Sequence, residues 1–346
     1  MTEEPPKPQS SNNLVKQLMA GVLAIGLLWW TFKDSNWSEL YRYMQSVQIL
    51  PVLALFVSGL ASHFLRAYRW IYLLQPLSDK KISLFNSFYA VIIGYAINIA
   101  IPRGGEVARL LSICRSEKLP WAGVLSTMLI DRVLDLALLV SLLGACLLVL
   151  PKNVLDSMPG LVPGGRGLLV ATVLGLLVLP FVGTILNKIL TLPVIQGKLP
   201  EKLLTKLTAL AEQFDTGTQA LKSPLKYPVI ALLSFLIWFC YWLNFYLMVF
   251  AFNLQDKIDP LKCLIIFTIG SMGVLVPTPG SAGGFHMLVS NGMTMVTDVP
   301  KDQALAFATL LHFIAFILVP CIPALLLVLF AGKGEKSSTT PPSTNQ

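Results

Sequence analysis

Two Pro/Gly interruptions of apolar sequence constrain the fold of this chain more than any other feature. The first is Pro102 to Gly105, in the run Y-A-I-N-I-A-I-P-R-G-G-E-V-A-R, and the second is P-T-P-G-S-A-G-G, from Pro277 to Gly284. Proline removes a backbone donor and glycine lets another backbone come close, so a helix is expected to end at each interruption. An apolar run stands on both sides of each one, which predicts two pairs of short helices.

The composition places these runs in a membrane protein. The chain is 55% hydrophobic and only 13% charged, with a mean hydropathy of +0.69. Soluble domains have about 25% charged residues, and a helix that spans a bilayer needs about 20 apolar residues. Several such runs are present, so we expect an all-α polytopic membrane protein. The net charge of +8 is spread over loops, without the basic stripe and stacking aromatic residues of a nucleic-acid-binding protein.

About six full spans and two re-entrant helical hairpins are expected. The spans are residues 14–32, 49–74, 121–150, 167–186, 227–252 and 303–330, and the hairpins are 84–118 and 261–296. Leucines at helical spacing in residues 198–222 predict an amphipathic helix on the membrane surface. Residues 1–13 and 333–346 are polar and are expected to be disordered tails. A single transmembrane domain, 14–332, is therefore predicted, with one half in 14–150 and the other in 167–332.

The two interruptions stand at matching positions in these halves. Three pairs of positions have nearly the same offset: Ile49 and Tyr227 (178 residues), Pro102 and Pro279 (177), and Trp121 and Gln303 (182). Backbone groups freed by a break cannot face lipid and must be buried in protein or line a wet cavity. Paired interrupted helices at corresponding positions are typical of transporters built from inverted repeats, which is the arrangement that we predict.

The distribution of Lys and Arg predicts the orientation. With a cytoplasmic N-terminus and hairpins that return to the side they left, 18 of the 26 Lys and Arg residues lie inside, seven lie outside and Arg132 lies in the membrane. This agrees with the positive-inside rule. We expect a multi-pass protein of the cytoplasmic (inner) membrane with both termini in the cytoplasm. The first hairpin then enters from inside and the second from outside.

Charged residues lie deep in the span 121–150. Asp131 and Asp135 are one helical turn apart, and Arg132 can neutralise only one of them. Charges at that depth are costly and face the bundle interior or a watery cavity. A second cation is therefore needed, and Arg103 or Arg109 is the candidate. A salt-bridge network that only orients helices and a role in transport are both compatible with this pattern.

Two further arginines, Arg66 and Arg69, stand near the end of the span 49–74. Arginine stems can cover apolar surface while the guanidinium groups reach the headgroups, so we expect both at the membrane interface; a role at the substrate is the alternative. After the first break, Val107 and Leu111 belong to an apolar helical face. Glu106 and Arg109 lie on the other face, three residues apart and able to pair.

The breaks themselves suit an anion. Backbone N–H groups of a glycine-rich turn, and the positive end of the helix that follows, form a site for a group such as a lipid phosphate near Gly105 and near Gly284. Arg103 and Arg109 would add charge-assisted donors, and Asn98 can donate or accept. His286 follows the second break; we expect a hydrogen-bonded interface residue there, with proton transfer as the alternative.

Nothing in the sequence supports a metal site, a cofactor or a catalytic residue. The five cysteines stand singly, no C-x-x-C or H-E-x-x-H occurs, and the three histidines are far apart in sequence. No nucleophile, base and orienting group can be assembled from neighbouring residues. We expect a protein that is not an enzyme.

The motifs N-I-A-I-P-R-G-G-E-V-A-R, D-R-V-L-D and P-T-P-G-S-A-G-G together resemble the flippase-like membrane region of lysylphosphatidylglycerol synthases, from about residue 14 to 330. Only a short tail follows, so we expect a stand-alone member without an aminoacyl-transferase domain. By position, the resemblance implicates as substrate-binding or hinge residues Asn98, Pro102, Arg103, Gly105, Glu106, Arg109, Asp131, Arg132, Asp135, Pro277, Pro279, Gly280, Gly283 and Gly284. The family often has an acidic residue shortly after the late glycines, where this chain has His286. This departure leaves open whether the substrate of this chain differs from that of the family.

The resemblance implies a lipid transporter of the flippase type. An anionic or aminoacylated phospholipid, or a polyprenyl-linked lipid, would place its headgroup between the hairpins while its tails stay in the bilayer. Arg103 and Arg109 would hold the phosphate, Asp131 and Asp135 would balance charge, and Pro102, Pro277 and Pro279 would act as hinges. The alternatives are a membrane transferase that uses a lipid-phosphate donor, and a non-catalytic scaffold whose partner is a lipid-modifying enzyme. The oligomeric state is left open.

Overall fold

The computed structural model describes residues 10–101, 104–149, 156, 160–178, 181–196, 199–219 and 224–336. Every regular element in these residues is helical, which confirms the all-α class. The α-helices are α1 (Ser10–Phe32), α2 (Trp37–Gln45), α3 (Ile49–Leu74), α4 (Leu84–Ala100), α5 (Gly104–Glu117), α6 (Trp121–Val149), α8 (Leu161–Val178), α9 (Val182–Leu190), α10 (Pro193–Gln196), α11 (Glu201–Thr218), α12 (Tyr227–Ala251), α13 (Pro260–Met272), α14 (Gly284–Val296), α15 (Lys301–His312) and α16 (Val319–Lys336).

Several helices differ from the predicted segments. The span predicted at 167–186 is two helices, because α8 ends at Val178 and α9 begins at Val182. The last predicted span contains a π-helical segment, Phe313–Leu318, between α15 and α16. Helix α2 was not predicted; it is short and polar, and the side chain of Asn36 caps its N-terminus. Helix α1 begins at Ser10 and α16 ends at Lys336, inside the segments predicted as tails, whose remaining residues lie outside the described ranges.

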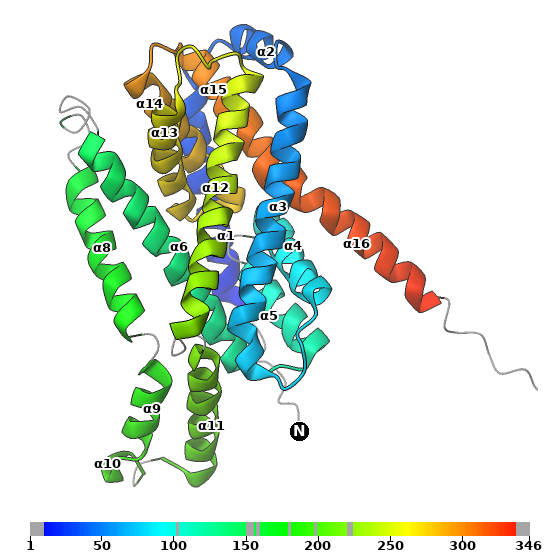
Figure 1. The fold of residues 1–346 in the computed structure, drawn as a ribbon, viewed down its shortest axis with the longest axis vertical. Coiled ribbons are helices and arrows are strands. Elements are labelled where there is room, and N and C mark those ends of the chain that lie inside the picture. Colours follow the sequence, from blue (N-terminus) through cyan, green and yellow to red (C-terminus); the bar gives the residue numbers. More distant parts are fainter. Residues whose placement is uncertain are drawn as a thin grey trace, which may run out of the picture.

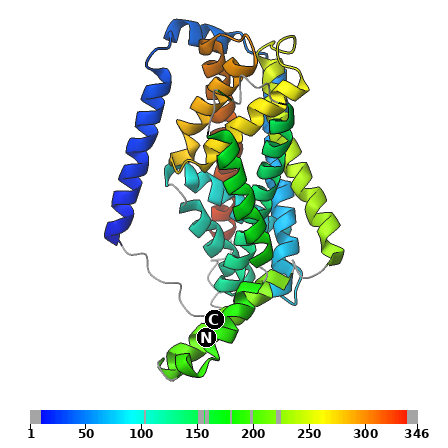
Figure 2. The same cartoon turned by 90° about the vertical axis from the view of Figure 1, so that its left-hand side faces the viewer.

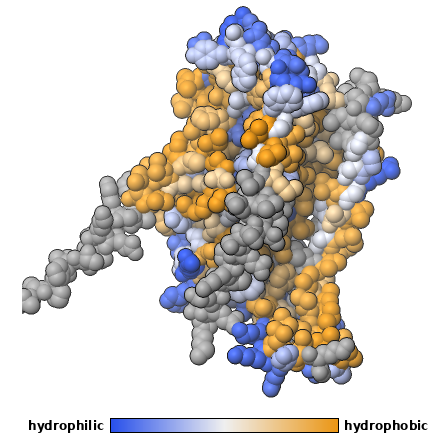
Figure 3. All heavy atoms as spheres, turned by 180° about the vertical axis from the view of Figure 1, so that it is seen from behind, coloured by the Kyte–Doolittle hydropathy of each residue, from blue (hydrophilic) through white to orange (hydrophobic). Residues whose placement is uncertain are grey.

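Length and composition alone qualify three helical stretches of the described residues to cross a membrane: Ile49–Leu77, Tyr227–Ala251 and Lys301–Leu329. Shorter apolar helices are Met19–Phe32, Leu84–Ala100, Val162–Gly175 and Pro260–Leu275. Hydrophilic side chains gather at the two ends of the molecule, and apolar side chains form a broad band between these ends (Figure 3). A polytopic membrane fold fits this surface, while the number of six full spans stays a prediction.

Helices α3 and α12 form the centre of the bundle and run antiparallel (Figure 1). At one end of the pair, the N–H of Gln48 donates to the carbonyl of Ala251 at 2.9 Å. Near the other end, Nη1 of Arg69 donates to the hydroxyl of Ser234 at 2.8 Å. Polar groups at helical spacing on the buried face of α3 therefore find partners on α12, as small and hydroxyl-bearing residues do between membrane helices.

Each predicted hairpin consists of two packed helices, α4 with α5 and α13 with α14, while its re-entrant course in a membrane stays a prediction. The first lies in the lower half of the molecule and the second in the upper half (Figure 1). Their tips meet: a Cβ atom on Gly280, at the tip of the second hairpin, would lie 3.7 Å from the Cα of Ile99, at the end of α4. The short 3₁₀ turn Pro279–Ser281 packs on α4.

Glycines allow the two helices of each hairpin to touch. A Cβ atom on Gly105 would lie 1.8 Å from the carbonyl oxygen of Gly94. In the second hairpin, a Cβ atom on Gly273 would lie 2.8 Å from the carbonyl oxygen of Gly284. Real Cβ atoms do not come this close to a backbone oxygen, so both contacts need residues without side chains.

The amphipathic segment predicted at 198–222 corresponds to α11. Its most buried residues are Ala211, Gly217 and Thr218, and the helix packs against α6 and α9. Together α9, α10 and α11 extend below the bundle, whereas α1 runs along its side (Figures 1 and 2). The predicted apolar face includes Leu203, which is 43% exposed. Leu207, Leu210 and Phe214 of the same face are partly buried beside Ala211, so the contact face of α11 overlaps the predicted one, and the location of the helix on a membrane surface stays a prediction.

Candidate functional site

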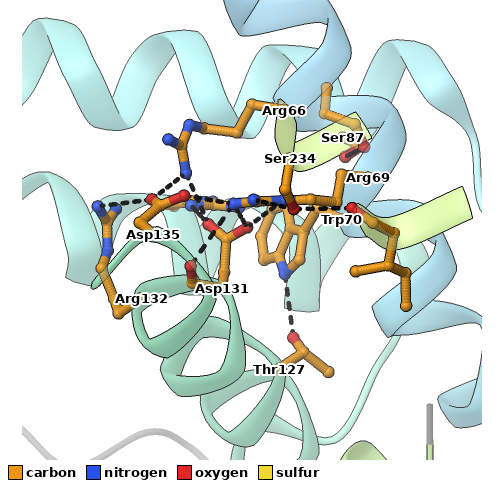
Figure 4. A network of polar contacts seen from close by, with 12 residues as sticks. Arg66, Arg69, Trp70, Ser87, Thr127, Asp131, Arg132, Asp135 and Ser234 are labelled. Carbon is orange, nitrogen blue, oxygen red and sulfur yellow. Dashed lines mark hydrogen bonds and ion pairs between the residues drawn. The ribbon is translucent and has the colours of Figure 1, made fainter. Parts of the chain in front are cut away.

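Asp131 of α6 is the centre of a buried ion network (Figure 4). Its carboxylate is fully buried and accepts hydrogen bonds from three arginines. Nη2 and Nε of Arg69 donate to Oδ1 at 2.6 and 3.2 Å. Nη1 of Arg66 and Nη1 of Arg109 each donate to Oδ2 at 3.1 Å. A buried carboxylate is tolerated only when it is paired and hydrogen-bonded in this way.

Asp135, one turn further along α6, joins the same arginines from α3. It accepts from Nη1 of Arg66 and from Nη2 of Arg69, both at 2.8 Å. Hydroxyl groups of α12 hold the other edges of the two guanidinium groups: Nη2 of Arg66 donates to Tyr241 at 3.1 Å, and Nη1 of Arg69 donates to Ser234. Helices α3, α6 and α12 are therefore joined through one polar cluster.

The prediction that Arg66 and Arg69 reach the membrane interface is wrong. Their side chains are 2% and 0% exposed. Both point inward because Ser58, Ser62, Arg66 and Arg69 lie on one buried face of α3. This recurrence of polar residues at intervals of four, four and three is the sequence signal that identifies them as interior residues. The alternative, a role at the site, is the one that their position supports.

Arg109 enters the network from α5. Its guanidinium carbon lies 3.8 Å from the ring centroid of Trp70, a cation–π geometry, and Trp70 is fixed by a hydrogen bond from Nε1 to Thr127 at 3.0 Å. Arg109 is 3% exposed, yet Nε and Nη2 have no hydrogen-bond partner. A second cation was predicted to neutralise the two aspartates, with Arg109 as one candidate, and Arg109 does pair with Asp131.

Glu106 and Arg132 form the outer end of the network. Nη2 of Arg132 lies 2.9 Å from Oε1 of Glu106, with side chains 41% and 35% exposed, and Nη1 lies 3.9 Å from Asp135. The expected pairing of Glu106 with Arg109 is not among the ion pairs of the described residues. Both have partners on α6 instead, Glu106 at the outer Arg132 and Arg109 at the buried Asp131, because α5 turns its charged face toward α6 and leaves Val107 of its apolar face 58% exposed.

The charges of the network do not cancel. Among the described residues it contains four cations and three anions, a net charge of +1: Arg66, Arg69, Arg109, Arg132, Glu106, Asp131 and Asp135. A buried excess of positive charge with unpaired N–H groups is costly without an anionic partner. The arrangement is therefore suited to receive one negative charge.

Asn98 has a local role. Its Oδ1 accepts a hydrogen bond from the backbone N–H of Gly105 at 2.9 Å, which satisfies one of the free donors in the first turn of α5. Pro102 and Arg103, predicted as hinge and phosphate ligand, lie outside the described residues. Next to these two residues, the hydrogen bond from Gly105 to Asn98 holds the start of α5 to α4.

The residues predicted at the second break form a separate site at the tip of the second hairpin. Gly280 and Gly283 have φ values of +55° and +85°, which favour glycine. The backbone N–H of Gly283 donates to Nδ1 of His286 at 3.4 Å. His312, which the sequence analysis did not single out, contacts the carbonyl oxygen of Gly280 through Nε2 at 2.7 Å. Its ring centroid lies 4.6 Å from that of His286.

This histidine pair is surrounded by aromatic rings. His286 and His312 are 5% and 6% exposed, and His312 stacks on Phe316. A carbonyl oxygen can only accept, so Nε2 of His312 carries the proton. The pair thus fixes the second tip to α15, and the hydrogen-bonded role expected for His286 agrees with its contact to Gly283. Pro277 and Pro279 flank this tip; none of these residues touches the ion network by a hydrogen bond or ion pair among the described residues.

No group of three or more His, Cys, Asp or Glu side chains in the described part of the chain lies close enough to hold a metal ion. The network itself offers guanidinium N–H groups without partners, which can bind an anion. In comparisons with known proteins, the family described as "Lysylphosphatidylglycerol synthase TM region" matches residues 17–322. No curated protein matches the chain.

Proposed function

Because this chain belongs to the lysylphosphatidylglycerol synthase TM region family, we propose that it is a membrane transporter of the flippase type. It moves an anionic or aminoacylated phospholipid, or a polyprenyl-linked lipid, across the cytoplasmic membrane. The family supports a membrane function connected with lipids. Transport, rather than lipid modification, is the part of the proposal that the chemistry of the site favours.

The observation that carries the proposal is the unpaired edge of Arg109. The guanidinium group is buried, lies in a cluster with a net charge of +1, and has two nitrogens without a partner. A lipid phosphate matches both the charge and the planar fork of donors. Asp131 and Asp135 hold the neighbouring arginines in place, so that the binding edge of Arg109 is ready before the phosphate arrives.

An inverted repeat gives this site access to both leaflets. The glycine contacts of the hairpins support the repeat, since Gly94 and Gly105 correspond to Gly273 and Gly284 at the same offset of 179 residues. The packing agrees: α6, after the first hairpin, contacts α13 of the second, and α16, after the second, contacts α4 of the first. Transporters with this architecture expose a site near the middle of the membrane to either side in turn.

The two halves differ in chemistry. At the same offset, Arg66, Arg109 and Asp131 correspond to Phe245, Leu288 and Leu310. Phe245 packs in an aromatic cluster with Phe267 and other rings. The first half thus supplies the charged groups and the second half an apolar counterpart. A headgroup is held by the first hairpin, and the aromatic tip of the second moves against it.

The test is lipid transport by the purified full chain in liposomes that contain a headgroup-labelled anionic lipid. Label that reaches the outer leaflet is quenched by a membrane-impermeant reagent. We expect Arg109→Gln to slow transport about 10- to 100-fold, because a charge-assisted hydrogen bond contributes about 1.5–3 kcal/mol. The matched control is Arg42→Gln, since Arg42 is 68% exposed on α2. Equal rates for both variants, with unchanged thermal unfolding, contradict the assignment.

The same experiment separates the alternatives. A transferase changes the mass of its lipid, which mass spectrometry of the extracted lipids detects. A scaffold neither moves nor changes lipid on its own. If the wild-type chain changes the mass of its lipid but transports none, and Arg109→Gln abolishes the mass change, lipid modification replaces our proposal.

A further inference from the structure

We propose that the seam between α5 and α6 is a lateral entrance for the phosphodiester headgroup of a two-chain lipid, and that the Glu106–Arg132 ion pair is its gate. This inference rests on the proposed lipid transport and names where, and from which leaflet, the substrate arrives. The Glu106–Arg132 pair is the part of the network that is exposed at the surface.

The gate is a charged pair on an apolar surface. Around the gate, α6 exposes Leu125 and Leu129, with exposed fractions of 37% and 41%. Leu125 and Leu129 precede Arg132 by seven and three residues, so they share its face of α6. Charged side chains at membrane depth do not face lipid tails without a partner. A lipid with a charged headgroup and apolar tails satisfies both parts of this surface.

A continuous set of cationic donors leads inward from the gate. Arg132 has a buried Nε without a partner, and Arg109 has Nε and Nη2 without partners. Glu106 and Arg109 are one helical turn apart on α5 and bind different groups of α6, Arg132 and Asp131. A phosphate that enters the seam therefore meets Arg132 first and Arg109 next.

The gate opens by exchange of partners. A phosphate that takes the place of Glu106 gives Arg132 a new anionic partner, so this partly exposed pair can separate without leaving Arg132 unpaired. The inner pairs of Asp131 are buried, and their disruption is far more costly. The outer pair thus moves while the inner pairs stay.

The position of the network along the helices defines the leaflet. Arg69 lies five residues before the end of α3, which corresponds to about 8 Å of helix, and Asp131 lies ten residues after the start of α6, about 15 Å. Both distances are measured from the same end of the bundle, where α3 leads into α4. The excess of Lys and Arg in the loops of this end assigns it to the cytoplasm. The lipid therefore enters from the cytoplasmic leaflet.

The test is photocapture of lipid by the full chain in liposomes. The photoreactive residue p-benzoylphenylalanine replaces Leu129, which shares the face of Arg132 at the seam, or, as a control, Val170, which is 58% exposed on α8. The probes are phosphatidylglycerol and diacylglycerol with the same labelled tails. We expect at least fivefold more capture of phosphatidylglycerol than of diacylglycerol at position 129, and equal capture of both at position 170. In Arg132→Gln, the preference at position 129 should fall below twofold.

Soluble glycerol phosphate distinguishes the source of the headgroup. If an excess of it abolishes capture at position 129 and is itself bound there, the site takes free phosphate esters, and lateral entrance of a lipid is wrong. Equal capture of both lipids at position 129 also overturns the gate, since the seam then touches bulk lipid only. Capture does not depend on transport. A headgroup preference in a chain that moves no lipid would therefore support the gate and contradict the proposed transport.

Discussion

Gly105 lies so close to Gly94 that a Cβ atom on Gly105 would be 1.8 Å from the carbonyl oxygen of Gly94. The two backbones are therefore in direct contact across the first hairpin. The side chain of Asn98 lies at the same contact, where it accepts the N–H of Gly105. This contact brings α5, and with it Arg109, against α4 and into the ion network.

We expect Gly105→Ala to be among the most destabilising substitutions in the chain. The added methyl group has no space and must push α5 from α4, at a cost of about 1–3 kcal/mol or more. Gly144→Ala is the control, since nothing lies within 4 Å of a Cβ atom at that position of α6, and alanine there favours the helix by up to about 1 kcal/mol. Thermal unfolding in detergent micelles measures both. A Gly105→Ala protein as stable as Gly144→Ala would falsify the close contact.

Asp131 is predicted to be more important for stability than any exposed acid. Asp131→Asn leaves three buried arginines short of one negative charge, which we expect to cost about 3–5 kcal/mol. Glu106→Gln removes one of the two acidic partners of Arg132 at the open edge of the network and should cost less. Urea unfolding of the two variants in the same detergent gives the comparison. Similar midpoints for both would mean that water reaches Asp131.

Arg69 should not be replaceable by lysine. Its guanidinium group donates to Asp131, Asp135 and Ser234 through three different nitrogens. A lysine ammonium cannot bridge three partners in these directions, so Arg69→Lys is expected to lower stability by about 2–4 kcal/mol, although the charge is kept. Arg42→Lys on α2 should change stability by less than about 0.5 kcal/mol. A protein that tolerates both substitutions equally contradicts the bridging geometry.

The tip of the second hairpin depends on His312. In His312→Phe the ring can still stack on Phe316, but the hydrogen bond to the carbonyl of Gly280 is lost, at a cost of about 1 kcal/mol. We expect faster amide hydrogen exchange in residues 278–284, with little change in α12. Exchange is measured by mass spectrometry of peptic fragments. Unchanged exchange at the tip would mean that the contact to Gly280 does not hold it.

The elements that the sequence predicted well are those whose ends have a chemical cause. Helix α3 has the predicted bounds, Ile49–Leu74, and α4 ends at Ala100, next to the predicted break. Proline and glycine end helices by local chemistry, so the positions of both hairpins could be predicted. The apolar run of 167–186 contains Pro180, between the end of α8 at Val178 and the start of α9 at Val182, but the prediction weighed the apolar character of the run above this proline and missed the division.

The site could be predicted only in part. Asp131 and Asp135 were identified because carboxylates in an apolar run need partners wherever they point. Arg66 and Arg69 were misplaced because an arginine near a helix end can reach either the headgroups or the interior, and only packing decides. The decisive partner, α12, supplies Tyr241, which lies 175 residues from Arg66 in the chain. Contacts at that distance follow from the fold and not from local pattern.

The burial of Arg66 and Arg69 has a consequence for how the chain is made. Inserting an arginine costs at most about 2.5–3.5 kcal/mol, the value at the centre of a membrane helix, and the carboxylate of Asp131 that neutralises Arg69 is synthesised 62 residues later. At about 5–20 residues per second, the delay is about 3–12 s. During that time α3 carries two charges without their native partners. We therefore expect the ribosome-bound chain to keep the arginine-bearing end of α3 in the insertion machinery, or at the bilayer surface, until α6 emerges.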